Sequence, residues 1–342
     1  MSAPAIAPAA ALRRLIARRD LERHEVESLF GQLMDGELDA PTQAALLMGL
    51  AVKGETAAEL AGAAAAMRHR AIPIEHHREG AVDTCGTGGD GKGTFNISTA
   101  AAFVAAGAGV PIAKHGNRSI SSRSGSADVL SALGVDVTVP AARAARALDE
   151  IGIAFLFAPL LHPAMREVMA VREALGVRTA FNLLGPLTNP AGARRQVLGV
   201  YARDRVLLVA RVLAELGSEH ALVVHGEDGL DEITLTGVTH AAEVRGGEVT
   251  ESVLDPRELG FAYVDGAALA GGEPAENAAA LAALLAGREG PLRDVTLLNA
   301  GAAVWVSGRA DSLRAGISAA RAALDGGAAA DKLRALRDHY GG

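Results

Sequence analysis

The sequence is poor in cysteine and in lysine. Its single cysteine, Cys85, excludes an intrachain disulfide framework and any metal site built from several cysteines. Only four of the 33 basic residues are lysines, and 40 acidic residues outnumber the basic ones. The resulting formal charge of -7 argues against a nucleic-acid-binding protein that works through bulk positive charge. The lysines are Lys53, Lys92, Lys114 and Lys332.

The sequence also lacks a convincing membrane segment. The longest stretch without a charged residue, 93–113, could span a bilayer by length, but it contains Asn96, Ser98, Thr99, several glycines and Pro111. The N-terminus is apolar before it becomes basic, which is the reverse of the order in a secretory signal. We therefore expect a cytoplasmic protein that binds neither membranes nor nucleic acid.

The distribution of apolar residues predicts two kinds of structure. The first seventy residues show helical periodicity without a strand pattern. From Gly80 onward, short apolar runs alternate with helical patterns and glycine-containing loops. These runs are 81–84, 110–113, 153–157, 196–201 and 221–225. Such alternation predicts an α/β fold with a mostly parallel central sheet, preceded by a small helical domain. We place the boundary between residues 1–72 and 73–342.

A glycine-rich loop follows the first expected strand, with five glycines in residues 86–93. Gly86, Gly88 and Gly91 satisfy the dinucleotide pattern G-x-G-x-x-G, but no acidic residue follows at the required distance of ~20 residues. The P-loop pattern also fails, because Gly93 stands where that motif needs a hydroxyl. What remains is a loop whose backbone N–H groups can surround an anion at a helix start. The alternative is a turn that uses glycine for steric reasons alone.

Three polar residues follow this loop, Asn96, Ser98 and Thr99, and we expect them to form the capping turn of the next helix. One helix and one strand later comes a second polar loop, 114–122, continued by 124–128. Its cations, amide and hydroxyl groups suit the oxygens of a polyphosphate, although a solvated surface loop has a similar composition.

A third candidate is the pair Asp231-Glu232, again in a glycine-containing loop. Adjacent carboxylates suit Mg²⁺, which binds one or two protein carboxylates and leaves positions for substrate phosphates. Most such pairs are solvated surface charges, so the pair gains weight only from the two loops that would need a counter-ion.

Taken together, these motifs resemble the anthranilate phosphoribosyltransferases, of the nucleoside-phosphorylase-like phosphoribosyltransferases. The resemblance rests on the blocks 86–90, 96–99, 114–122, 124–128, 162–165, 178–179, 181–190 and 231–232. It implies a homodimer in which a helical domain, completed by helices from about 162–190, is hinged to an α/β domain. It also implies Mg²⁺-dependent transfer of phosphoribose from 5-phosphoribosyl-1-pyrophosphate to the amine of anthranilate, a step of tryptophan biosynthesis.

The resemblance assigns roles to individual residues. Those expected to bind phosphoribosyl pyrophosphate are Gly86, Gly89, Asp90, Thr94, Asn96, Ile97, Ser98, Thr99, Lys114, His115, Gly116, Asn117, Arg118, Ser119, Ile120, Ser121, Ser122 and Ser126. Those expected at anthranilate are Gly86, Asn117 and Arg172, and those expected at magnesium are Ser98, Asp231 and Glu232. The attacking aromatic amine has its own lone pair, so we assign no general base, and we interpret His115 as a hydrogen-bonding or packing residue. Lys92 departs from the family pattern and receives no role.

Two other functions stay open at the level of sequence. A pyrimidine nucleoside phosphorylase would share the Lys-His-Gly and Gly-Ser-Ala-Asp blocks, but the block 182–187 and the Asp-Glu pair favour the transferase. A nucleic-acid-binding relative without transferase activity would need a basic face and an eroded first loop, and this chain has an intact 86–90.

Overall fold

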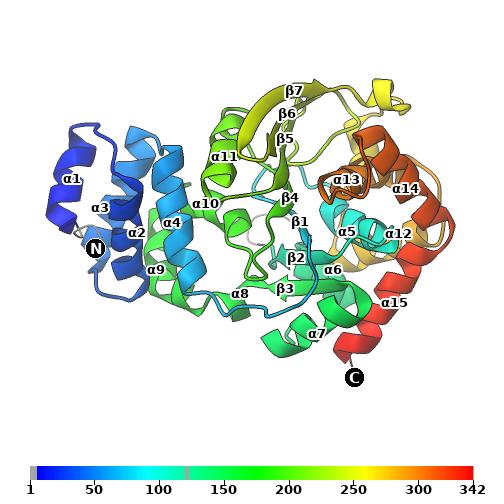
Figure 1. Cartoon of the computed structure of the whole chain (residues 1–342), viewed down its shortest axis with the longest axis horizontal. Helices are drawn as coiled ribbons and strands as arrows, with labels where there is room; N and C mark the ends of the chain where they lie inside the picture. The colour runs from blue at the N-terminus through cyan, green and yellow to red at the C-terminus, as the bar shows by residue number, and fades with distance from the viewer. Residues whose placement is uncertain (1–5, 120–122, 342) are drawn as a thin grey trace.

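The structure is a computed structural model that describes residues 6–119 and 123–341. A helical bundle lies at the N-terminal end, and a larger α/β part built around one sheet lies beside it (Figure 1). This arrangement confirms the fold class that the sequence predicts.

The N-terminal bundle consists of α1 (Pro8–Ile16), α2 (Arg23–Met34), α3 (Ala40–Lys53) and α4 (Ala57–His69). The start of α4 shows how the sequence sets these limits. The Glu59 N–H donates to the Thr56 hydroxyl at 3.2 Å, and the Thr56 N–H donates to the Glu59 carboxylate at 2.9 Å. This reciprocal pair satisfies two N–H groups that a helix start leaves free.

Two later helices join the same bundle: α9 (Arg166–Leu175) and α10 (Phe181–Leu184). Val168 and Phe181 are buried in the core that α2 and α4 form, and the Phe181 ring lies 5.6 Å from that of Phe30. The chain therefore returns to the helical part after it has already built three strands of the sheet.

The central sheet has seven strands in the order β3-β2-β1-β4-β5-β6-β7. Its strands are β1 (Val82–Gly86), β2 (Ile112–Gly116), β3 (Ile153–Phe157), β4 (Arg195–Gly199), β5 (His220–Gly226), β6 (Thr239–Arg245) and β7 (Glu248–Leu254). The first five are parallel, and each overlaps one of the five apolar runs of the sequence. The last two form an antiparallel hairpin that the sequence pattern did not predict.

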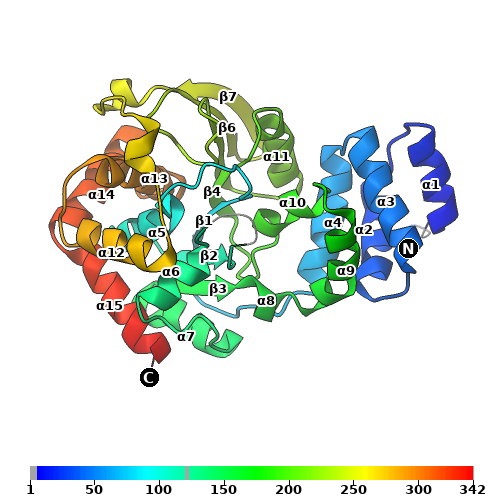
Figure 2. The same cartoon turned by 180° about the vertical axis from the view of Figure 1, so that it is seen from behind.

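Helices cover both faces of the sheet, as parallel strands require. One face packs against α5 (Ile97–Gly107), α13 (Pro291–Val306) and α15 (Ala328–Gly341), and α14 (Leu313–Asp325) packs on α13 and α5. The other packs against α11 (Asp204–Glu215), which in turn contacts α4 of the helical bundle (Figures 1 and 2). The remaining helices are α6 (Ser126–Ala132), α7 (Ala141–Ile151), α8 (Ala158–Leu161) and α12 (Pro274–Leu285), with 3₁₀ turns at Pro163–Met165, Gly185–Leu187, Pro256–Leu259 and Gly266–Leu269.

The strand order reverses between β1 and β4. From β1 the chain proceeds through α5 to β2 on one side, and from β4 it proceeds through α11 to β5 on the other. Ligands of open α/β sheets bind at such a reversal, outside the carboxyl ends of the strands. The fold therefore directs the search for a site to the ends of β1 and β4.

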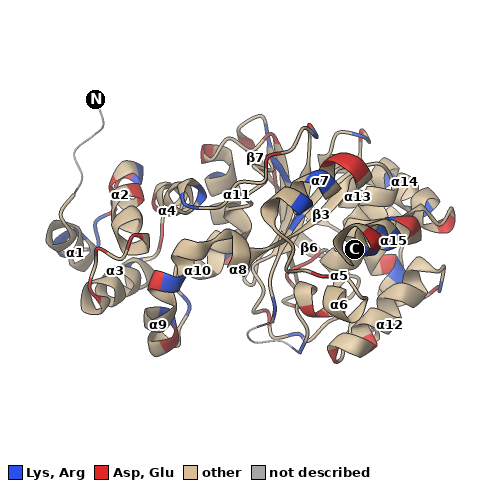
Figure 3. Ribbon diagram, turned by 90° about the horizontal axis from the view of Figure 1, so that it is seen from below, with Lys and Arg blue, Asp and Glu red and all other residues tan. Residues whose placement is uncertain are grey.

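Charged residues of both signs are interspersed over the outer helices in the view of Figure 3. Among the described residues, no helix combines the length and the apolar character needed to cross a bilayer.

Candidate functional site

Two glycines form the floor of the site at the strand-order reversal. Gly86 ends β1, Gly199 ends β4, and the two are paired in the sheet register. A Cβ atom on Gly199 would lie 1.5 Å from the backbone oxygen of Asp231, and one on Gly86 would lie 2.5 Å from Asp231 Oδ2. The loop that carries the Asp-Glu pair therefore crosses Gly199 at backbone contact distance, which only glycine permits, and places the Asp231 side chain against Gly86.

The two carboxylates of this loop are each held by a backbone N–H of a different segment. Asp231 Oδ2 accepts from the Gly88 N–H at 2.8 Å, and Glu232 Oε1 accepts from the Ser98 N–H at 3.0 Å. Burial, with the charge of Asp90, raises the pKa of Asp231 to about 7. Burial and the neighbouring Asp231 raise the pKa of Glu232 to about 8. Two neighbouring carboxylates, one half-buried and one buried, that repel one another favour the approach of a cation.

The residues present fit a magnesium ion that is shared with a substrate. In the described part of the chain, no group of three or more His, Cys, Asp or Glu could hold a metal by itself. Asp231 and Glu232 nevertheless supply two hard oxygen ligands, and the Glu232 carboxylate lies at the first turn of α5 beside Ser98. Mg²⁺ is typically bound in this way, by one or two carboxylates with substrate phosphates completing the shell.

The glycine loop leads from β1 to α5. Gly88, Gly89, Gly91 and Gly93 all have φ between 61° and 73°, a region that other residues rarely adopt. Asp90 Oδ1 accepts from the Lys92 N–H at 3.1 Å, and Thr94 forms an isolated bridge to Ala270. The loop is thus tied down at Gly88 by Asp231 and at Thr94 by this bridge.

The capping turn lies where the sequence predicts it, with Asn96 at the N-cap position of α5. Asn96 precedes α5, which begins at Ile97, yet its side chain makes no capping hydrogen bond. Its amide instead donates to the Ser124 carbonyl at 3.1 Å and accepts from Asn277 at 2.9 Å. Asn96 therefore joins the glycine loop to the second loop, and Ile97 and Thr99 are buried against the core rather than exposed in the loop.

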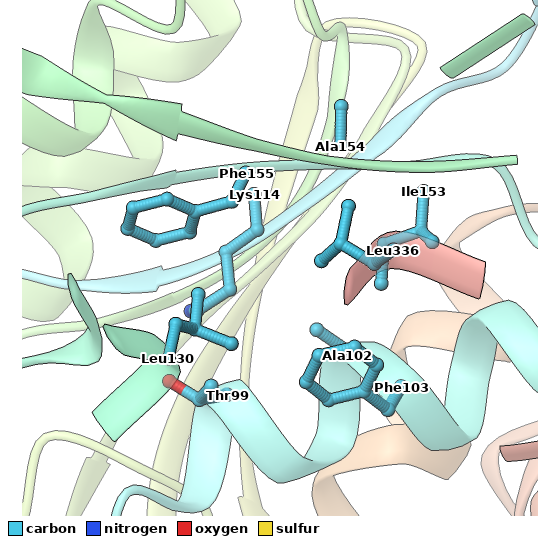
Figure 4. A pocket seen from close by; sticks show the side chains of 9 residues that line it. All are labelled: Thr99, Ala102, Phe103, Lys114, Leu130, Ile153, Ala154, Phe155 and Leu336. Atoms are coloured by element: carbon cyan, nitrogen blue, oxygen red, sulfur yellow. The ribbon is translucent and has the colours of Figure 1, made fainter. Parts of the chain in front are cut away.

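Lys114 lies below both loops, at the end of β2, with 4% of its surface exposed. Its ammonium donates to the Thr84 carbonyl and, at 3.3 Å, to the Ser98 hydroxyl. Burial lowers the pKa of Lys114, and nearby negative charges, led by Asp83, oppose that shift. Figure 4 shows the side chain pointing from β2 toward the start of α5, beside Thr99. The surrounding void has a volume of only about 10 Å³ and is lined by apolar groups, so it serves packing and is not a substrate pocket.

The second loop is built around Asp128. This carboxylate accepts from the Arg118 guanidinium at 2.9 Å and from the Ser119 and Gly125 N–H groups at 3.0 Å each. Ser126 donates to the Asn117 carbonyl at 3.2 Å, and the Asn117 side chain is exposed. Gly116 ends β2, while Ile120, Ser121 and Ser122 lie outside the described residues.

His115 packs against His162 of the 162–165 block, with ring centroids 5.1 Å apart. Within the described ranges, His115 Nε2 and both ring nitrogens of His162 are buried without a hydrogen-bond partner. Burial, with His162 as a neighbour, lowers the pKa of His115 to about 3, and burial lowers that of His162 to about 4. Both rings are neutral at pH 7, which agrees with a packing role and leaves a proton-accepting nitrogen at each.

Arg172 lies on α9, in the segment that returns to the helical bundle. Its guanidinium stacks over the Phe181 ring, 5.2 Å from the centroid, and burial lowers its pKa. No carboxylate of the described residues forms an ion pair with it. Arg172 lies on α9 and Asn117 follows β2, so the two residues expected at one substrate come from the helical part and the α/β part.

Two supporting residues were missed in the sequence. Asp83, inside β1, is fully buried and accepts from the His115 N–H at 3.0 Å. Asn189 donates to the Ala113 carbonyl at 2.8 Å. These two hydrogen bonds hold the β2 backbone on either side of Lys114, at Ala113 and His115. A carboxylate within an otherwise apolar run was the signal that could have identified Asp83.

The chain matches known proteins over most of its length. Residues 78–330 match the Glycosyl transferase family, a/b domain, and residues 9–71 match the Glycosyl transferase family, helical bundle domain. An anthranilate phosphoribosyltransferase of Anaeromyxobacter sp. (strain Fw109-5) is 55% identical over 326 residues, which cover 95% of this chain and 96% of that protein. One of Desulforudis audaxviator is 52% identical over 95% of this chain and 94% of its own.

Solved structures agree with these relatives. The crystal structure of anthranilate phosphoribosyltransferase from Thermus thermophilus superposes with a TM-score of 0.92 at 46% identity, covering 96% of this chain and 99% of that chain. The Saccharomyces cerevisiae enzyme in complex with PRPP and Mg superposes with a TM-score of 0.88 at 27% identity, covering 97% of each chain.

Proposed function

The chain belongs to the anthranilate phosphoribosyltransferase family, and on that premise we propose how its residues divide the work of the reaction. The enzyme transfers the phosphoribosyl group of 5-phosphoribosyl-1-pyrophosphate to the amine of anthranilate, giving N-(5-phosphoribosyl)anthranilate and pyrophosphate in tryptophan biosynthesis. Relatives that share the whole chain favour this activity over a pyrimidine nucleoside phosphorylase or an inactive nucleic-acid-binding relative.

In this reaction the bond between the anomeric carbon and the pyrophosphate oxygen breaks, and a bond from the anthranilate nitrogen forms. Negative charge grows on the leaving group while positive charge grows on the ribose ring. The amine loses one proton after attack, and we assign no residue to remove it. Catalysis then depends on stabilising the leaving group and on holding the two substrates in line.

The buried ammonium of Lys114 carries the proposal. It lies between the glycine loop and the second loop and, among the described residues, bonds to a carbonyl and a hydroxyl, so its positive charge is available to an anionic ligand. A desolvated cation acts more strongly on developing negative charge than one in water. The glycine loop, from Gly86 and Gly89 to Asp90 and Thr94, and the loop from Lys114 to Ser126 would enclose the phosphoribosyl pyrophosphate.

We propose that Ser98, Asp231 and Glu232 hold Mg²⁺. When bound, the ion neutralises charge on the pyrophosphate oxygens. The raised pKa values of Asp231 and Glu232 support this role, because a bound cation would offset the burial and the mutual repulsion that raise them.

Anthranilate is proposed to bind between the domains. Arg172 would pair with its carboxylate, since its guanidinium fork lies half-buried without a carboxylate partner among the described residues. Asn117, with an exposed amide, and Gly86 would meet it from the α/β side.

A fluorescence assay tests the activity. We expect magnesium-dependent loss of anthranilate fluorescence when phosphoribosyl pyrophosphate is added to the purified protein. Unchanged fluorescence together with phosphorolysis of thymidine or uridine would contradict the proposal. A D231A/E232A variant should lose the magnesium response, and full activity across a magnesium titration would remove these residues from the metal site.

Three further assignments complete the proposal. We propose a cytoplasmic homodimer, to be checked by sedimentation velocity of the purified enzyme, where a monomer at micromolar concentration would contradict it. We also propose that the domain boundary lies between residues 72 and 73, and that the segment of about 162–190 belongs to the helical domain.

A further inference from the structure

The pair Arg178-Thr179 stands out in the sequence but has no role in the function described so far. Arg178 lies between α9 and α10, outside the sheet domain. Its guanidinium stacks on the Tyr201 ring, 4.1 Å from the centroid, and its Nη2 donates to the Gly89 carbonyl at 2.5 Å. One exposed side chain thus links the returning segment to the glycine loop.

Besides Arg178, the glycine loop is held near its middle by the Gly88 N–H, which donates to Asp231 Oδ2 at 2.8 Å. Glycine has the largest conformational freedom of any residue, and four glycines here have positive φ. The Thr87 N–H donates to the Gly199 carbonyl at 2.9 Å and Thr87 accepts from the Tyr201 N–H at 3.0 Å, which fixes the start of the loop. Beyond Gly88, the Arg178 guanidinium reaches the loop backbone from outside and donates a charge-assisted hydrogen bond to it.

The other end of the returning segment is anchored in the helical bundle. Phe181 packs on Phe30 of α2, and the Arg172 guanidinium lies over the same Phe181 ring. Thr179 is held in between, because its N–H donates to Asn182 Oδ1 at 2.9 Å. The short segment from Arg172 to Phe181 therefore contacts the helical core at its ends and the glycine loop through Arg178.

We propose that Arg178 is a positioning residue that holds the glycine loop in the conformation that receives the pyrophosphate group. Stacking on Tyr201 fixes the plane of the guanidinium, and the bond to Gly89 then fixes the loop. This inference rests on the proposed function for its substrate, but the loop geometry it describes exists without substrate.

Kinetics give the first test. R178A should raise the KM for phosphoribosyl pyrophosphate on the order of tenfold to hundredfold, the range expected for losing a hydrogen bond to a charged group. The KM for anthranilate at saturating phosphoribosyl pyrophosphate and the melting temperature should not change. R178K, which keeps the charge and loses the planar fork, should fall between R178A and the wild type.

Matched variants separate positioning from general damage. Tyr201→Leu removes the ring that orients the guanidinium and should reproduce part of the R178A effect, while Tyr201→Phe keeps the ring and should match the wild type. R166A removes an exposed arginine of the neighbouring α9, whose guanidinium donates to the Pro163 carbonyl at 3.4 Å, and should also match the wild type.

A protease that cleaves only after lysine gives a test that needs no activity. Lys92 lies in the glycine loop and is exposed, whereas the Lys53 side chain and the whole of Lys114 are each 4% exposed and Lys332 is half-buried. Native cleavage at Lys92 yields fragments 1–92 and 93–342. R178A should accelerate this cleavage about tenfold without ligand, and R166A should not.

The outcomes decide between explanations. Unchanged cleavage at Lys92 and an unchanged KM in R178A would overturn the inference. A lower kcat with unchanged KM and cleavage would overturn it as well, because Arg178 would then act on the reacting atoms. If the wild type shows no transfer, the proposed function fails, and the cleavage rates still decide whether Arg178 holds the loop.

Discussion

Two of the four lysines have side chains shielded from solvent, and they differ in what surrounds them. The Lys53 side chain in the helical bundle is 4% exposed, and its ammonium lies 2.8 Å from Asp20 and 2.9 Å from Glu59. Lys114 at the sheet edge is also 4% exposed, yet its ammonium bonds to a carbonyl and a hydroxyl and to no carboxylate of the described residues.

The pKa shifts follow from these surroundings. Burial alone would lower the pKa of Lys53, but its bonds to Asp20 and Glu59 raise it above the ordinary value. Burial lowers the pKa of Lys114. We infer that Lys53, which is paired with carboxylates, stabilises the folded protein. Lys114, which contacts no carboxylate of the described residues, is available to bind an anionic ligand.

The largest expected effect is a loss of activity when Lys114 is replaced. K114M should lower kcat/KM for phosphoribosyl pyrophosphate by about 1,000-fold, since one preorganised charge that stabilises a leaving group contributes on that scale. Its free energy of unfolding should be no lower than that of the wild type, because a buried cation has been removed. Steady-state kinetics and urea unfolding on the same preparation test both statements. A variant that is active but unstable would show that the two lysines have the same role.

The reciprocal change at Lys53 should have the opposite outcome. K53M leaves Glu59 buried without its cation and should destabilise the protein by about 3 kcal/mol, the cost of breaking a buried ion pair. Urea unfolding gives the free energy, and kcat/KM of the folded fraction should match the wild type. Adding E59Q should recover part of the loss, and a double variant no more stable than K53M would contradict the pairing.

The contrast can be sharpened with the histidine pair, whose buried ring nitrogens also lack partners among the described residues. The unfolded histidines bind protons near pH 6.5, while the folded ones do so only near pH 4 for His162 and pH 3 for His115. Their stabilising contribution is therefore complete above pH 6.5 and is lost as the pH falls toward 4. Replacing His162 by Phe should reduce the stability lost between pH 6.5 and 5 by roughly 2 kcal/mol. Chemical unfolding at the two pH values measures the loss of stability. An equal loss in the wild type and in the variant would contradict a lowered pKa of His162.

The smallest effect is expected at Lys332. Its ammonium donates to the Ile151 carbonyl at 2.5 Å, at the C-terminal end of α7. Since a cation at a helix C-terminus contributes a few tenths of a kcal/mol to about 1, K332M should cost about 0.5 kcal/mol and leave kcat/KM unchanged. The thermal midpoint resolves such a change. If K332M lost as much stability as K53M, the contribution of a lysine to stability would not depend on whether its ammonium is paired with a carboxylate.

The sequence predicted the parallel part of the fold well, because buried strands leave continuous apolar runs. It missed β6 and β7, whose alternating polar and apolar residues lie at an edge of the sheet. The dipeptide Gly246-Gly247 between them, with φ of 59° and 90°, was a hairpin signal that could have been used.

The sequence predicted which loops form the candidate site, but not how their side chains contact one another. Spacing along the chain places the glycine loop and Lys114 after strands, which is enough to expect an anion site. It does not reveal that Asn96 bridges two loops, or that Lys53 belongs to an ion pair with Glu59, because those contacts depend on which helices pack together. The stacking of Arg172 on Phe181 was hidden for the same reason.

The close approach of Asp231 to Gly199 limits which amino acids this enzyme can accept at position 199. Because the Asp231 backbone oxygen occupies the place where a Cβ atom would be, even alanine would displace the loop that carries both carboxylates, although the strand could still form. A substitution there should yield a folded protein without catalysis. A library of all amino acids at that codon, selected for growth without tryptophan, should therefore return glycine alone.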